Sequence, residues 1–160
     1  MQKALDQARN ALAKGEFPVG CIIEYKGAVL VTSSRIGTTG SVSNEVDHAE
    51  MIALKKLTQM SQDINRGQAV LFSTMEPCLM CLGATILSGI GKIVYAYEDV
   101  MGGGTQCRLH KLTPLYAQSP IAVVSNIMRA ESLALFKAYF QNSDNHYWEG
   151  SLLATYTLNQ

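Results

Sequence analysis

Two short segments carry side chains suited to metal chemistry. Residues 48–50 read His-Ala-Glu, and residues 77–81 read Pro-Cys-Leu-Met-Cys. Cys78 and Cys81 are three residues apart, so in a helix both thiols fall on one face within a single turn. Two thiolates and one imidazole are common zinc ligands, and three protein ligands leave a fourth tetrahedral position open, as catalysis requires. The spacing therefore predicts a zinc ion held by His48, Cys78 and Cys81.

Glu50 has the side chain needed for proton transfer beside such a site. Residues two apart in a helix point in different directions, so we expect Glu50 to face the open coordination position rather than to bind the metal. Zinc lowers the pKa of a bound water to about 7, which supplies hydroxide at neutral pH. Glu50 is therefore the predicted proton shuttle and the predicted catalytic residue.

Each segment taken alone permits a plainer interpretation. A Cys-x-x-Cys pair also occurs as a redox pair or as half of a structural zinc site, and a histidine at a helix start is often a cap or a surface residue. A structural zinc would need a fourth ligand, for which the candidates are Cys21, Cys107, His110 and His146. The two motifs together favour the catalytic site over these alternatives.

Alternating helices and strands must position the two motifs. Apolar spacing predicts helices at 2–14, at 48–57 with Asp47 as the N-cap, at 78–88 with Pro77 in the first turn, and at 130–140. Rows of β-branched and apolar residues predict strands at 19–25, 28–32, 69–73, 93–97 and 121–124. Residues 33–46 and 98–119 are predicted to be irregular, and 141–160 show no clear pattern. This order predicts a single α/β domain over residues 1–160.

Composition narrows the function classes. The chain has 160 residues, of which 48% are hydrophobic and 16% charged, as in one globular domain. Thirteen cationic and thirteen anionic residues give a formal charge of zero, so no strong overall attraction to nucleic acid is expected. No apolar run reaches the roughly 18 residues of a membrane helix, and the first residues lack the apolar core of a signal peptide. We therefore expect a cytoplasmic protein without a disulfide framework.

The motifs resemble those of the cytidine deaminase superfamily, whose zinc hydrolases share H-x-E and P-C-x-x-C. Residues 15–20 (GEFPVG) and 75–84 (MEPCLMCLGA) are similar to the branch that holds tRNA adenosine deaminases, guanine deaminases and cytosine deaminases. The resemblance implies a three-layer α/β/α sandwich around a mixed five-stranded sheet, one Zn²⁺ per chain and commonly a homodimer. It also implies hydrolytic deamination, in which hydroxide adds to an amino-bearing ring carbon and ammonia leaves.

The resemblance implies substrate contacts at Ser34, Ala49 and Asp99, with a turn-capping role as the alternative for Asp99. Val19 is a further candidate for the substrate site, with core packing as its alternative. Ser34 stands where the tRNA branch usually carries asparagine, and the chain after Leu112 lacks the basic helix typical of that branch. Because phosphate contacts need Lys and Arg, we expect a small nucleobase or nucleoside as the substrate. The alternative is an adenosine in a tRNA anticodon loop, which is converted to inosine.

Two further hypotheses stay open at this point. The tail 141–160 closes over the pocket, contacts a partner subunit or packs as an ordinary terminal segment. A zinc-bearing binding domain without catalysis is a third functional class, and Glu50 argues against it, since a structural site gains little from a carboxylate that is not a ligand.

Overall fold

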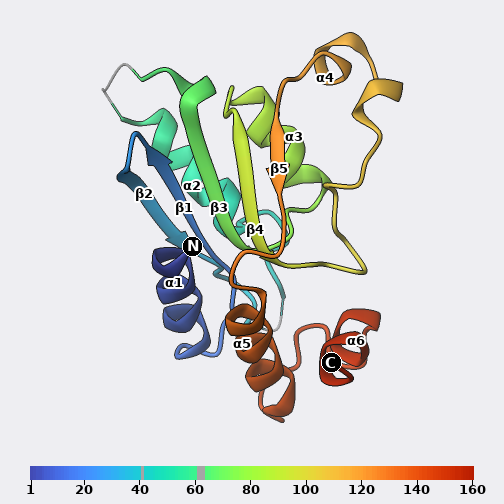
Figure 1. Ribbon diagram of the computed structural model, residues 1–160. Helices are drawn as coiled ribbons and strands as arrows, with labels where there is room; N and C mark the ends of the chain where they lie inside the picture. Colours follow the sequence, from blue (N-terminus) through green and yellow to red (C-terminus); the bar gives the residue numbers. More distant parts are fainter. Residues whose placement is uncertain (41, 61–63) are drawn as a thin grey trace.

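A five-stranded mixed sheet forms the centre of the structure (Figure 1). The computed structural model describes residues 1–40, 42–60 and 64–160. The strand order is β2-β1-β3-β4-β5. β1 (Gly20–Tyr25) pairs antiparallel with β2 (Ala28–Ser34) and with β3 (Ala69–Met75), whereas β4 (Lys92–Tyr97) and β5 (Ala122–Val124) run parallel to β3. The predicted mixed five-stranded sheet is therefore confirmed.

Helices cover both faces of this sheet (Figure 1). α2 (Ala49–Thr58) and α3 (Leu79–Leu87) pack side by side on one face. α1 (Gln2–Leu12) and α5 (Arg129–Gln141) pack on the other, and α6 (Leu152–Leu158) lies against α5. The three-layer α/β/α fold follows the prediction. Among the described residues, no helix is long and apolar enough to span a membrane.

The contact between α1 and the first strand depends on a glycine. A Cβ at Gly20 would lie 2.1 Å from the carbonyl oxygen of Ala4 and 2.5 Å from the backbone nitrogen of Ala8. Only a residue without a side chain lets β1 approach the helix this closely. The packing fixes the start of β1, which lies next to the predicted motifs.

Two predicted helix starts are wrong by one or two residues. His48, not Asp47, is the N-cap of α2, and the Asp47 carboxylate instead accepts a hydrogen bond of 2.6 Å from Asn44. Cys78 is the N-cap of α3, so Pro77 precedes the helix rather than lying in its first turn. In both motifs a predicted metal ligand takes the N-cap position.

The segments without a clear pattern contain short helices. η2 (Leu109–Lys111) and α4 (Pro114–Ala117) interrupt the region predicted to be irregular, and η1 (Arg66–Gln68) precedes β3. In the tail, Ser151 caps α6 by accepting a hydrogen bond from the backbone of Ala154. The Tyr97 hydroxyl lies 3.0 Å from the Thr157 hydroxyl, which attaches the tail to the sheet. Residue 41 of the predicted 33–46 loop lies outside the described residues.

Candidate active site and metal centre

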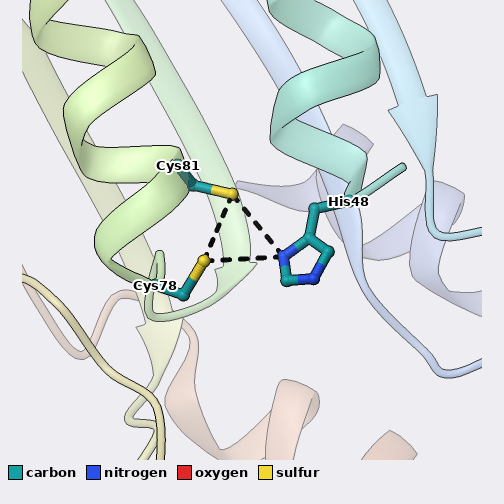
Figure 2. A group of neighbouring side chains, drawn as sticks. All are labelled: His48, Cys78 and Cys81. Carbon is teal, nitrogen blue, oxygen red and sulfur yellow. Dashed lines mark hydrogen bonds between the residues drawn. The ribbon is translucent and has the colours of Figure 1, made fainter. Parts of the chain in front are cut away.

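Three predicted ligands form a nearly equilateral triangle (Figure 2). Cys78 Sγ lies 3.7 Å from Cys81 Sγ and 3.7 Å from His48 Nδ1, and Cys81 Sγ lies 3.6 Å from the same nitrogen. Tetrahedral zinc bonds of about 2.3 Å to sulfur and about 2.0 Å to nitrogen would place two sulfurs about 3.8 Å apart and sulfur and nitrogen about 3.5 Å apart. The three atoms therefore fit one zinc ion and leave a fourth position open.

Two helix N-termini bring these atoms together. His48 and Cys78 cap α2 and α3, and Cys81 lies one turn into α3 (Figure 2). The positive end of a helix dipole favours thiolates. Hydrogen bonding from the Cys81 thiol and from His48 lowers the pKa of Cys78 to about 4. The pKa of Cys81 is raised, because its thiol donates this hydrogen bond to Cys78 and because the side chain is buried.

Glu50 lies beside the triangle without joining it. Its side chain is buried at 3% exposure, and burial raises its pKa. One carboxylate oxygen, Oε1, accepts a hydrogen bond of 2.7 Å from Ser73 Oγ. The other oxygen, Oε2, lies 3.7 Å from Cys81 Sγ. The carboxylate is thus held next to the metal position, where a proton-transferring group is needed.

A cavity of about 320 Å³ opens onto this centre. His48, Glu50 and Cys78 form part of its wall, as do three of the predicted substrate contacts, which are Val19, Ala49 and Asp99. Its remaining walls are Phe17, Arg35, Glu45, Met75, Glu76, Met80, Gly102, Tyr147 and Trp148. The volume suits a ligand of nucleobase size.

Among the residues that the structure describes, Arg35 lines this cavity and Ser34 does not. Successive residues of a strand face opposite ways. Ser33 donates a hydrogen bond of 2.6 Å to the carbonyl oxygen of Ala49 in α2, so Ser34 points away from that helix. Arg35 is buried and donates a hydrogen bond to the carbonyl oxygen of Asp47, next to the predicted metal ligand His48. The side chain that enters the cavity from the end of β2 is therefore an arginine.

The tail supplies two cavity residues, Tyr147 and Trp148, as one of the three interpretations of segment 141–160 expects. The rings of Tyr147 and Trp148 stack with centroids 5.1 Å apart, and both pack on Phe17. The Tyr147 hydroxyl donates a hydrogen bond of 2.7 Å to Glu45, and burial raises the pKa of Tyr147 to about 12. An adjacent pair of aromatic residues in a polar segment was the available signal for this wall.

The glycine run 102–104 packs tightly against residues 76–79, which we call the metal-binding loop because Cys78 is a predicted zinc ligand. Gly103 forms a β-bridge with Cys78, and the Gly104 amide donates a hydrogen bond of 2.9 Å to the Pro77 carbonyl oxygen. The Glu76 carboxylate accepts hydrogen bonds from the backbone amides of Asp99 and Thr105. These contacts hold Asp99 at the cavity, where burial raises the pKa of its carboxylate.

Within the described ranges, His48, Cys78 and Cys81 are the only close group of three or more potential metal ligands. Cys21 is buried in β1, and Cys107 packs near Leu82. His146 pairs with Glu149 on the surface, and His110 lies in η2, outside the ligand group. The described structure therefore offers no fourth protein ligand from these candidates.

Comparison with known proteins identifies the family. A family model described as the cytidine and deoxycytidylate deaminase zinc-binding region matches residues 1–97. The chain belongs to this family. The resemblance seen in the sequence is therefore confirmed, together with the enzyme class, a zinc-dependent hydrolytic deaminase, and its zinc cofactor.

Relatives of this deaminase differ in substrate. A tRNA-specific adenosine deaminase of Bacillus subtilis (strain 168) is 28% identical over 141 residues, covering 88% of this chain and 86% of the relative. A solved structure from a study of A-to-I editing by tRNA:A34 deaminases has a TM-score of 0.62 at 25% identity, covering 78% of this chain and 95% of the other. The guanine deaminase of Nitrosomonas europaea has a TM-score of 0.64 at 20% identity, covering 86% of this chain and 81% of the other. At this identity the similarity shows a shared fold alone.

Proposed function

We propose that the chain removes the exocyclic amino group of a nucleobase by hydrolysis, with His48, Cys78 and Cys81 as the zinc ligands and Glu50 as the proton shuttle. The observation that carries this proposal is that two corners of the ligand triangle, His48 and Cys78, line the same cavity as Glu50, whose Oε2 lies 3.7 Å from the third corner, Cys81. A structural zinc site has no use for a buried carboxylate beside an open coordination position.

The protein groups have distinct roles in this reaction. A zinc ion held by His48, Cys78 and Cys81 would lower the pKa of a water molecule, which then attacks the amino-bearing ring carbon. Glu50 takes one proton from that water and delivers it to the adjacent ring nitrogen; it then takes the proton of the hydroxyl group added to the carbon and passes it to the amino group, which leaves as ammonia. Ala49 is the first residue of α2, where backbone N–H groups have no helical partner, and it lines the cavity. Its N–H is the proposed hydrogen-bond donor to the base.

For the substrate, the comparisons favour an adenosine in a tRNA loop over a small compound. The curated relatives that cover 88% of this chain are named tRNA-specific adenosine deaminases. We therefore place the alternative from the sequence analysis first. An adenosine in a loop is already unpaired, so little energy is needed to bring its base into the cavity.

A small nucleobase or nucleoside is the second candidate, and two observations favour it. The chain has a formal charge of zero, whereas phosphate contacts need cations. Tyr147 and Trp148 of the tail wall the cavity, and this tail lacks the basic helix typical of the tRNA branch. The tail thus contributes to the pocket, as one of the sequence hypotheses expects.

Ammonia release by the zinc-loaded protein tests these proposals. The panel contains guanine, cytosine, adenine, their nucleosides and an anticodon stem-loop with adenosine. Release only from the stem-loop supports the first candidate, and rapid release from one small compound replaces it with the second. If the zinc-loaded protein releases no ammonia from any compound of the panel, the proposed deamination is contradicted.

We also propose that the chain forms a homodimer through the outer surface of α3. Leu79 and Leu87 are each 63% exposed there. Beside them lies an apolar groove lined by Leu79, Leu82, Ile86, Leu109, Leu112 and Tyr116. Exposed apolar surface of this kind commonly marks a protein interface. Sedimentation at micromolar concentration should give twice the chain mass of 17.4 kDa, and a monomer would contradict the proposal.

A further inference from the structure

Three small side chains lie in a row on the sheet beneath the start of α2. Cys21 in β1 pairs with Ser33 in β2 and with Ser73 in β3, so the three residues share one face of the sheet. Ser33 holds the carbonyl oxygen of Ala49, as described above, and Ser73 holds the Glu50 carboxylate. The row therefore contacts both the backbone and the acid of the His-Ala-Glu motif.

The hydroxyl of Ser73 can donate only one hydrogen bond. Its oxygen accepts a long hydrogen bond of 3.4 Å from the Met75 amide, and its proton is directed to Glu50 Oε1 at 2.7 Å. Cys21 directs its thiol elsewhere, toward the carbonyl oxygen of Ile22 at 3.9 Å. Ser73 is therefore the member of the row that anchors the carboxylate.

Burial makes this anchor hard to replace. Ser73 is 0% exposed and Glu50 is 3% exposed. A buried carboxylate that is deprived of one donor loses a hydrogen bond that is costly in free energy to leave unmade. Loss of the hydroxyl would leave the carboxylate free to rotate about its last torsion, which is broad for glutamate.

We propose that Ser73 is a positioning residue that distinguishes the two oxygens of Glu50. Ser73 anchors Oε1, and Oε2 remains directed toward the metal position, where it lies 3.7 Å from Cys81 Sγ. Oε2 is thus the oxygen that exchanges protons with water and substrate. This inference rests on the proposed deamination, because the proton shuttle belongs to that reaction.

The test compares Ser73→Ala with a matched control, Ser132→Ala. Ser132 is also fully buried, and its hydroxyl donates a hydrogen bond of 2.6 Å to the carbonyl oxygen of Thr74, the next residue of the same strand. Ser132 lies on α5, on the opposite face of the sheet from Glu50. Both variants lose a buried hydroxyl that donates one short hydrogen bond, and Ser73→Ala also loses the long bond from the Met75 amide. Only Ser73→Ala loses a contact with Glu50.

Two measurements are made on the zinc-loaded proteins. With the substrate found in the panel above, kcat of Ser73→Ala should fall at least about 10-fold, a part of the 10²- to 10⁴-fold that proton transfer contributes, with KM and zinc content unchanged. Infrared difference spectra against Glu50→Gln isolate the carboxylate band of Glu50, which should shift in Ser73→Ala. Ser132→Ala should change neither kcat nor the band.

A wild-type kcat in Ser73→Ala overturns the inference, whatever the infrared band does. An unshifted band also overturns it, because the hydroxyl would then not hold the carboxylate. The infrared readout needs no substrate, so it tests the anchor even if the wild-type protein deaminates nothing in the panel. Absence of deamination by the wild-type protein would contradict the proposed function, but it would not contradict the contact between Ser73 and Glu50.

Discussion

Gly104→Ala should weaken zinc binding although Gly104 is not a ligand. A Cβ at this position would lie 2.6 Å from the backbone nitrogen of Leu79 and 2.8 Å from the carbonyl carbon of Cys78. Ordinary contacts begin at 3.4 Å, so the metal-binding loop or the glycine run must move by about 0.8 Å. Both contacts are with backbone, which cannot simply rotate away.

A shift of this size exceeds what a metal centre tolerates, since productive geometry requires placement within about 0.5 Å. Loss of a group that supports metal ligands typically costs 10- to 100-fold in metal affinity, and we expect a similar loss here. The assay is competition for zinc with a chromophoric chelator, together with thermal unfolding of the same samples.

Gly83→Ala is the matched control for this prediction. Gly83 lies in α3 close to Cys81, and a Cβ there would meet no atom within 4 Å. Alanine in a helix interior is favoured over glycine by about 1 kcal/mol, so this variant should bind zinc normally and unfold at a slightly higher temperature. A wild-type zinc affinity in Gly104→Ala would show that close packing of the glycine run does not fix the position of the metal-binding loop.

Three further predictions follow from the site and the tail. Cys78→Ser should lose zinc while staying folded, because one thiolate ligand is removed; a stable variant with one zinc per chain by elemental analysis would exclude Cys78 as a ligand. Trp148→Ala should raise KM about 10-fold with zinc content unchanged, because base stacking on an aromatic ring contributes about 1–3 kcal/mol; an unchanged KM in steady-state kinetics would remove Trp148 from the substrate site. Glu98→Gln should lower the free energy of unfolding by about 1 kcal/mol at pH 7, after allowance for solvent screening, because hydrogen bonding from Arg129 lowers the pKa of Glu98 from 4.5 to about 2. A carboxyl group whose pKa is lowered in the folded protein stabilises the fold at pH values above its unfolded pKa. The difference in free energy of unfolding between the wild-type protein and Glu98→Gln should therefore be complete above about pH 5 and vanish as pH falls toward 2. Urea unfolding across this pH range measures that difference, and a difference that does not change with pH would contradict the prediction.

The metal motifs were predictable because their chemistry is local. Cys78 and Cys81 share one helical turn whatever the rest of the fold does, and His48 with Glu50 marks the start of a second helix. The sheet was predictable for a similar reason, since β-rich runs alternate with helical spacing. Helix starts were less certain, because Asp47 is a better intrinsic cap than His48 and the tertiary structure places His48 there.

The rest of the site depends on register and long-range packing. Ser34 and Arg35 are neighbours in sequence, and only the pairing of β2 with the sheet decides which of them enters the cavity. Ser73 contacts Glu50 across 23 residues, and Tyr147 contacts Glu45 across 102. No pattern within one segment predicts such contacts. Substrate class is harder still, because charge and tail favour a small compound and the named relatives favour a tRNA.

The central claim is that Glu50 performs proton transfer beside a zinc ion that it does not bind. The most direct measurement pairs zinc content with ammonia release for the wild-type protein and Glu50→Ala, on the best substrate of the panel. We expect one zinc per chain in both proteins and a loss of turnover of at least about 10²-fold in the variant. Unchanged turnover in Glu50→Ala would contradict the proton-shuttle role, and loss of zinc from the variant would show that Glu50 is a ligand instead.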